Sequence, residues 1–169
     1  MSDPAYFRRF AAYNRWANRR LYDAVAQLPS AAYFQQRPAF FKSIHGGLNH
    51  LVVTDRIWLG RIVGKPVDYK LDQILYDDLA SLRAAREAED ERLIGIVDGV
   101  DIEGLERKIS YSNSRGEAFN TPLIQVFAHL FNHETHHRGQ VHDMLSQTDV
   151  PPPSLDLIAY IRLVDSGQA

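Results

Sequence analysis

Apolar residues recur at steps of three and four positions along most of this chain, which is the period of an amphipathic helix. The same period predicts three long helices over residues 43–63, 77–97 and 121–147. They follow a first helix that ends at Pro29 and whose apolar stripe comprises Phe7, Phe10, Ala17, Leu21, Ala24 and Leu28.

Cap residues indicate where two of these helices begin. Asp77 is a suitable N-cap for the third helix. The fourth should open at Thr121-Pro122, because a capping residue there precedes a proline at the first helical position. The connections over 29–43 and 63–77 are long, so the up-and-down order of the helices stays open.

Two shorter elements accompany the long helices. In LERKISYSNSRGEAF, Ile109 and Tyr111 alternate with polar residues and residues 113–116 are rich in turn formers, which predicts a small hairpin. The segment SLDLIAYIRLV (154–164) predicts a short closing helix. We therefore expect one all-α domain over residues 1–169, a four-helix bundle with a hairpin-like insertion before the last long helix and a short C-terminal helix.

Composition narrows the class of protein. The chain is 45% hydrophobic and 24% charged with a net charge of −2, so no basic field draws it to nucleic acid or to an anionic membrane. No apolar run approaches the roughly 20 residues of a membrane-spanning helix. The absence of cysteine excludes disulfides, thiolate metal ligands and a cysteine nucleophile, and fits a cytoplasmic protein. Any metal must be held by histidine, aspartate or glutamate.

Histidines concentrate on the fourth predicted helix, where NHETHHRGQVHD (132–143) holds four of the chain's seven. On a helical wheel His137 falls within the inward apolar stripe and His133 lies roughly 40° from it. His136 sits further out on one flank, His129 falls between His136 and His133, and His142 lies on the solvent side. The stripe itself consists of Val126, Leu130, Val141 and Met144.

Two histidines at positions i and i+4 on an apolar stripe favour a metal site. Each neutral imidazole carries two polar nitrogens that are costly to bury unpaired, and a divalent metal satisfies one nitrogen of each ring. The alternative is a pair of ordinary hydrogen-bonded core histidines. His50 on the second helix is the best third ligand, unless it is a boundary residue bonded to a carbonyl or to Asp55. His45 is its competitor, and we expect it near the rim.

The string His133-Glu134-x-x-His137 also matches the HExxH helix of zinc proteases, whose glutamate works on the metal-bound water. No glutamate follows Glu134, and Gly139 and His142 each fall one residue early for the longer HExxHxxGxxH pattern. This context argues against a protease. Glu134 is then a flank residue or a salt-bridge partner for a nearby arginine.

Several strings resemble the DinB family, also described as DinB/YfiT-like metalloenzymes. NHETHHRGQ (132–140) is similar to the family's NHxxHHRGQ helix, and LNHLVVTDRIW (48–58) to its second helix. YNRWANRRLYDAVAQL (13–28) and PPSLDLIAYIR (152–162) resemble its opening helix and closing segment. The resemblance implies a four-helix bundle that holds nickel or zinc with three histidines, which by position are His50, His133 and His137.

The resemblance also suggests chemistry, because some relatives are thiol S-transferases or a thiol-dependent maleylpyruvate isomerase. Three histidines would leave positions open on a metal, which is typical of catalytic sites. We therefore expect a metal-dependent enzyme that acts on a small molecule, in which the metal either polarises a bound water or activates a low-molecular-weight thiol that serves as cofactor. The alternatives are a non-catalytic, metal-binding interaction module and, more weakly, a hydrolase outside the protease families. Gln140 would bind the cofactor or substrate or serve as a buried amide, and Arg138 would be a packing or interface residue.

One feature of the first helix predicts a homodimer. Trp16 lies roughly 130° from the core stripe, with Tyr13 and Arg20 nearby, and an exposed aromatic patch usually marks a contact surface. The alternative is that the hairpin or the C-terminal segment covers Trp16 within one chain.

Overall fold

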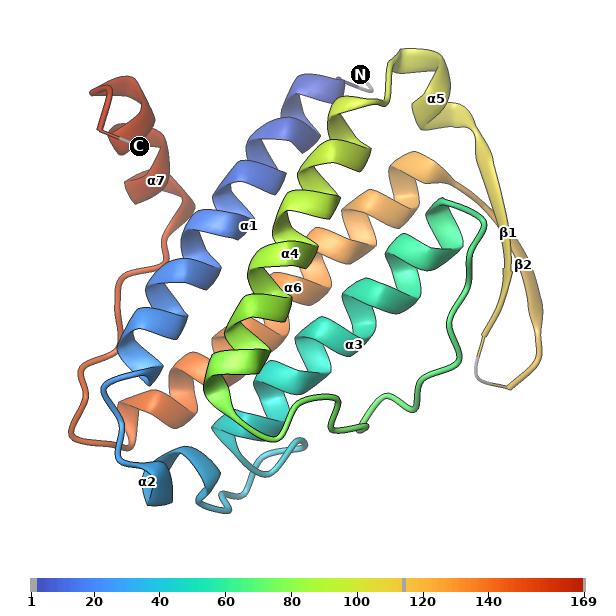
Figure 1. The fold of residues 1–169 in the computed structure, drawn as a ribbon. Helices are drawn as coiled ribbons and strands as arrows, with labels where there is room; N and C mark the ends of the chain where they lie inside the picture. The colour runs from blue at the N-terminus through green and yellow to red at the C-terminus, as the bar shows by residue number, and fades with distance from the viewer. Residues whose placement is uncertain (1–2, 114, 169) are drawn as a thin grey trace.

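The computed structural model describes residues 3–113 and 115–168, which form a mostly helical fold with one two-stranded sheet. Figure 1 shows the long helices side by side with the shorter elements around them. In chain order the elements are α1 (Pro4–Val25), α2 (Ser30–Phe34), α3 (Ile44–Ile62), α4 (Leu79–Asp98), α5 (Ile102–Glu106), β1 (Lys108–Ser112), β2 (Ala118–Pro122), α6 (Leu123–Ser146) and α7 (Leu157–Asp165).

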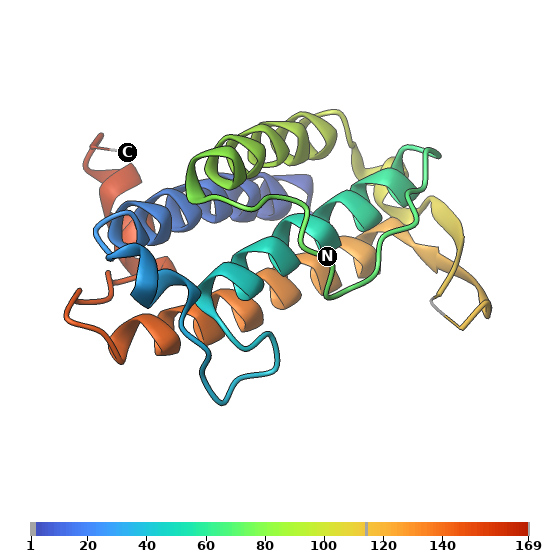
Figure 2. The same cartoon turned by 60° about the horizontal axis from the view of Figure 1, so that its bottom comes forward.

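The four long helices are those that the apolar period predicted, and each packs against two of the others. Helix α1 contacts α4 and α6, and α3 contacts the same two helices. Two buried apolar clusters fill the space between them, one around Leu59, Leu93 and Phe127 and the other around Leu21, Leu48 and Leu82. Figures 1 and 2 show α2 at one end of this assembly and α5 with the hairpin at the other.

Side-chain caps start three of the long helices. The Asp3 carboxylate accepts a hydrogen bond from the Ala5 amide, and the Ser43 hydroxyl accepts one from Gly46. Helix α4 begins after Asp78, whose carboxylate accepts from the Ser81 amide at 2.9 Å. The prediction of Asp77 as N-cap was therefore wrong by one residue.

The predicted hairpin is confirmed, and it changes where α6 begins. Strands β1 and β2 pair antiparallel with Ile109 opposite Thr121, and the Leu123 amide extends the pairing by donating to the carbonyl of Arg107. Thr121 therefore belongs to the sheet and does not cap the helix, as the sequence had suggested. Of the predicted turn residues, Ser114 lies outside the described part of the chain.

The closing helix α7 packs on α1 and covers the aromatic residue that predicted a dimer. The Trp16 ring lies 5.6 Å from that of Tyr160 and 6.0 Å from that of Tyr13, centroid to centroid. The Tyr13 hydroxyl donates to the carbonyl of Leu155 at 2.6 Å, which anchors the segment before α7. The intrachain alternative thus accounts for Trp16.

The short helices α2 and α5 were not predicted, because five residues are too few to display a period. Asp101 caps α5 by accepting from the Gly104 amide at 2.8 Å. Across residues 3–113 and 115–168, no helix combines the length and apolar character needed to span a membrane.

Candidate metal centre

Three histidines from two helices converge at the contact between α3 and α6. His50 comes from α3, and His133 and His137 come from successive turns of α6. One ring nitrogen of each lies within 4.8 Å of the corresponding nitrogens of the other two. The ring centroids are 4.3 Å apart for His133 and His137, 4.4 Å for His50 and His137, and 5.2 Å for His50 and His133.

A glycine lets the two helices approach closely near this site. Gly47 lies one turn before His50, and a Cβ atom in its place would stand 2.7 Å from the Cγ2 atom of Val141. That spacing is too short for a real contact, so residue 47 must lack a side chain if α3 and α6 are to keep this separation. The sequence therefore places a small residue where the ligand-bearing helices touch.

Two of the rings are held by hydrogen bonds through their Nδ1 atoms. His50 Nδ1 lies 2.7 Å from the carbonyl oxygen of Leu71, and His137 Nδ1 lies 2.9 Å from Oε1 of Gln140. Because both partners are acceptors, Nδ1 carries the proton and donates, which leaves the Nε2 lone pair free. This is the usual outer arrangement around a metal-binding histidine.

The remaining nitrogen of His50 has no partner in the described part of the chain. His50 is 3% exposed, and its buried Nε2 atom makes no hydrogen bond. An unpaired buried acceptor costs on the order of 1–3 kcal/mol, and a divalent cation between the three rings would satisfy it. The donor set of three imidazoles therefore fits zinc or nickel.

Burial keeps all three rings neutral. The pKa of His50 falls to about 4, because burial and the neighbouring His137 outweigh the hydrogen bond to Leu71, and that of His133 falls to about 3 through burial and the same neighbour. The pKa of His137 is also lowered by burial, although its hydrogen bond to Gln140 opposes the change. Neutral imidazole is the form that binds metals, so the site needs no deprotonation near pH 7.

An aromatic side chain covers one side of the site. The Phe41 ring stacks on His50 with a centroid separation of 3.8 Å and meets His137 edge-on at 5.4 Å. The loop that carries it turns back at Lys42, whose φ is 62°, and its ends are joined by a hydrogen bond from the Arg37 amide to the Lys42 carbonyl. Neither Phe41 nor Leu71 could be predicted from the sequence, because both lie in connections without a hydrophobic period.

The other histidines lie outside the cluster. His45 is 8% exposed and its Nδ1 lies 2.9 Å from the Tyr33 hydroxyl, so the expected place near the rim was wrong. Helix α2, which supplies Tyr33, covers it. His142 was expected in solvent but is half-buried, with Nε2 2.9 Å from the carbonyl of Pro153. His129 packs edge-on against Trp58, and His136 is exposed.

Gln140 connects the cluster to the exposed His136. Its Oε1 atom accepts from His137, and its Nε2 atom lies 3.1 Å from Nε2 of His136. The side chain thus orients a ring of the cluster. Its role in binding a cofactor stays a prediction.

Glu134 and Arg138 are buried in the helical core. Glu134 is fully buried and pairs with Arg138 at 3.7 Å and with Arg86 at 3.9 Å, so of the two predicted roles it has that of a salt-bridge partner. A carboxylate engaged with two core arginines is not available to a metal-bound water, which a zinc protease requires. Arg138 is 2% exposed and packs within the core.

The fold and the three-histidine cluster define a helical protein with a candidate metal centre, and sequence comparison supplies its family. The sequence model of the DinB family matches residues 1–167, so the chain belongs to the DinB family. The protein DinB of Bacillus subtilis (strain 168) is 27% identical over 178 residues, covering 100% of both chains. A crystal structure of a DinB-like protein from Bacillus subtilis superposes with a TM-score of 0.57 at 14% identity, covering 84% of this chain and 95% of that one. This second likeness concerns the fold.

Proposed function

We propose that this chain is a divalent-metal-dependent enzyme with one four-helix-bundle domain, in which His50, His133 and His137 hold nickel or zinc. The observation that carries the proposal is the buried Nε2 atom of His50, which has no partner among the described residues and belongs to a nitrogen cluster only 4.8 Å across. Three protein ligands suit a catalytic metal better than a structural one, which is usually closed by four.

The chain's own residues would prepare such a site in three ways. The Leu71 carbonyl and the Gln140 side chain hold two rings with Nε2 free to bind. Burial keeps the rings unprotonated. The stacked Phe41 ring excludes water from one side of His50. When bound, the metal would supply a Lewis acid that lowers the pKa of a coordinated thiol or water.

The reaction we propose uses a low-molecular-weight thiol and a small-molecule substrate, as in an S-transferase or a thiol-dependent isomerase. Because the chain contains no cysteine, a thiol nucleophile must come from a bound small molecule. Glu134 is turned into the core, so the residues near the cluster that could orient such a ligand are Gln140 and the exposed His136.

A second candidate is a metal-binding interaction module without catalysis. It is compatible with two surface hollows of about 370 and 210 Å³ that no residue of the cluster lines. The first lies between the end of α3 and strand β1, and the second lies beside α2. A module of this kind needs no substrate cavity at its metal.

The experiment that separates these functions has two stages. Metal content of the purified protein is measured first, with His142→Ala as a control in which a histidine outside the cluster is removed. Thiol transfer is then screened with glutathione and other small thiols. One metal per chain with turnover supports the enzyme, whereas metal without turnover on any thiol favours the module. A wild-type protein that takes up neither zinc nor nickel contradicts both.

A homodimer stays a prediction. The argument for it from an exposed Trp16 is weaker, because α7 covers that ring. Helix α7 itself has exposed apolar side chains, however, at Ile158 and Val164. Light scattering at micromolar concentration decides the matter.

A further inference from the structure

Helix α6 carries a charged side chain on its core-facing side one residue after each of its two cluster histidines. Glu134 follows His133 and Arg138 follows His137, and both are buried. Since one residue turns a helix by roughly 100°, the charged pair points into the core while the histidines face the metal site. The rotation of α6 about its axis therefore sets both groups at once.

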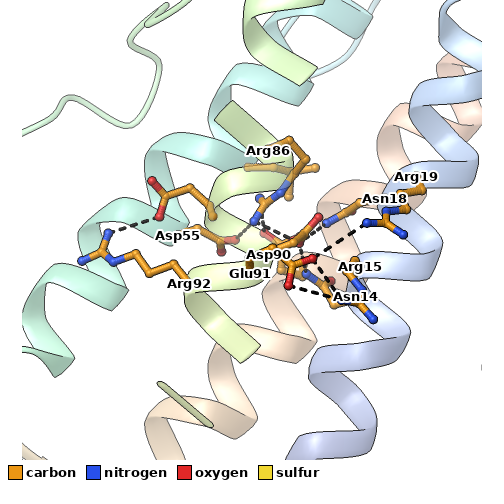
Figure 3. Close-up of polar contacts among 12 residues, drawn as sticks. Asn14, Arg15, Asn18, Arg19, Asp55, Arg86, Asp90, Glu91 and Arg92 are labelled. Carbon is orange, nitrogen blue, oxygen red and sulfur yellow. Dashed lines mark hydrogen bonds and ion pairs between the residues drawn. The ribbon is translucent and has the colours of Figure 1, made fainter. Parts of the chain in front are cut away.

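Arg86 of α4 stands between the two ligand-bearing helices. Its Nη2 atom lies 2.5 Å from Oδ2 of Asp55 on α3, and its Nη1 atom lies 3.9 Å from Oε1 of Glu134 on α6. The guanidinium is 1% exposed, and Figure 3 shows it reaching Asp55 from the neighbouring helix. A single side chain thus contacts α3 five residues after His50 and α6 one residue after His133.

Helix α1 completes the network from the opposite side. Asn14 and Asn18 donate to Oδ1 of Asp90, which also pairs with Arg86 at 3.2 Å. The same two asparagines accept hydrogen bonds from Nη1 of Arg138. All four long helices therefore meet in one buried polar network, in which the links to Glu134 on α6 are ion pairs without hydrogen bonds. Figure 3 shows the part formed by α1, α3 and α4.

This network contributes little net stability to the fold, but it can fix how the helices are placed relative to one another. It holds three carboxylates, of Asp55, Asp90 and Glu134, against the two guanidiniums of Arg86 and Arg138. Desolvation offsets much of the attraction in buried ion pairs, and apolar packing often stabilises as well or better. Their contacts are directional, however, and can fix the register of neighbouring elements.

We propose that Arg86 is a positioning residue for the three-histidine site. By pairing with Asp55 on α3 and Glu134 on α6, it sets the rotation and register that bring His50 to His133 and His137. The inference rests on the proposed function for its metal readout. Its geometric content concerns the arrangement of the rings alone.

The test removes the connection while keeping the net charge of the core. The double variant Asp55→Asn/Arg86→Met loses one negative and one positive charge. Its matched control is Arg56→Met/Glu89→Gln, which removes a 2.8 Å ion pair joining the same two helices without reaching α6. Both proteins, and wild type, are titrated with Co²⁺, whose visible absorption reports ligand geometry.

The proposal expects the double variant to unfold cooperatively, to bind Co²⁺ about tenfold more weakly or worse, and to show an altered absorption spectrum. The control should keep the wild-type affinity and spectrum. A folded double variant with wild-type affinity and spectrum overturns the proposal, as does a control that changes equally. A general loss of stability would not by itself change the spectrum of the folded fraction.

Two further measurements keep the proposal falsifiable. If the double variant does not fold, Glu134→Met removes both oxygen atoms that face Arg86 and Arg138 with little change in side-chain length, and an unaltered Co²⁺ spectrum there overturns the proposal. If wild type binds no Co²⁺, the proposed function fails while the positioning claim is still decided. Crystal structures without metal then compare the His50–His137 centroid separation, 4.4 Å here, between wild type and the variant. An unchanged separation overturns the claim, and a displaced ring supports it.

Discussion

The rings of His50 and His137 lie 4.4 Å apart, centroid to centroid, and meet at 73°. Each ring is fixed by a hydrogen bond at its Nδ1 atom. Leu71 holds the first ring and Gln140 the second. A loop carbonyl and an amide on α6 thus leave the Nε2 atoms as the free acceptors of both rings. Metal binding at this site would therefore depend on these two outer contacts as well as on the histidines.

Removing the outer contact on His137 should weaken metal binding without unfolding the protein. Gln140→Ala deletes the acceptor of the Nδ1 proton, so the ring loses its fixed tautomer and orientation. We expect metal affinity to fall by about 10–100-fold, measured by competition with a chelator of known affinity. Gln147→Ala is the control, because Gln147 is exposed just after α6 and its side chain donates a hydrogen bond to Asp143, away from the cluster. Equal affinities for the two variants would refute a role for Gln140.

The metal-free protein should lose stability as the pH falls below about 6.5. Burial lowers the pKa of His50 from 6.5 to about 4 and that of His133 to about 3, so the unfolded chain takes up protons that the folded chain refuses. The free energy of unfolding therefore decreases with falling pH until the folded pKa values are reached. Between pH 6.5 and about pH 5 the decrease is at most about 2 kcal/mol for each ring.

Urea denaturation of chelator-treated protein at about pH 7.5, 6 and 5 measures this dependence. His50→Gln should show a shallower pH dependence, because one of the histidines with a lowered pKa is gone. A free energy of unfolding that stays level over this range in wild type would disprove the burial of neutral rings.

The packing of α7 on α1 gives a prediction independent of the metal. Tyr160 is 8% exposed and contacts Trp16, so Tyr160→Ala should destabilise the protein by about 2–4 kcal/mol and shift Trp16 emission to longer wavelength. The measurement uses a Trp58→Phe background, since Trp58 is the chain's other tryptophan. Ile158→Ala is the matched control, because Ile158 is 52% exposed on the same helix. An unshifted spectrum for Tyr160→Ala would contradict this packing.

The long helices and the cluster histidines were predictable because each depends on a pattern of residues that can be recognised within one helix. The period of apolar residues marks the helices, and two histidines one turn apart interrupt an inward stripe. The beginning of α6 was misplaced because the pairing of Thr121 with Ile109 depends on a strand elsewhere in the chain.

The buried network could not be read from the sequence for a related reason. In SLRAAREAEDERL, Arg86 and Asp90 look like residues of a solvated face, because charge alone gives no sign of burial. Their partners Asp55 and Asn18 lie on other helices. Phe41 and Leu71 were missed because connections have no period that would indicate which side chain or carbonyl turns inward.

Thermal unfolding of His137→Ala, together with metal content, tests the central claim most directly. Wild type, chelated wild type and the variant should all show a cooperative transition, because the two large buried clusters consist of apolar side chains and include none of the three histidines. Metal should be lost in the last two, with a lower melting temperature from lost metal linkage and a small cavity. A structural zinc module would instead unfold when its metal is removed. Cooperative unfolding in all three, with metal only in wild type, is the result that a site kept for chemistry predicts. Loss of the transition on chelation, or full metal occupancy in His137→Ala, would contradict it.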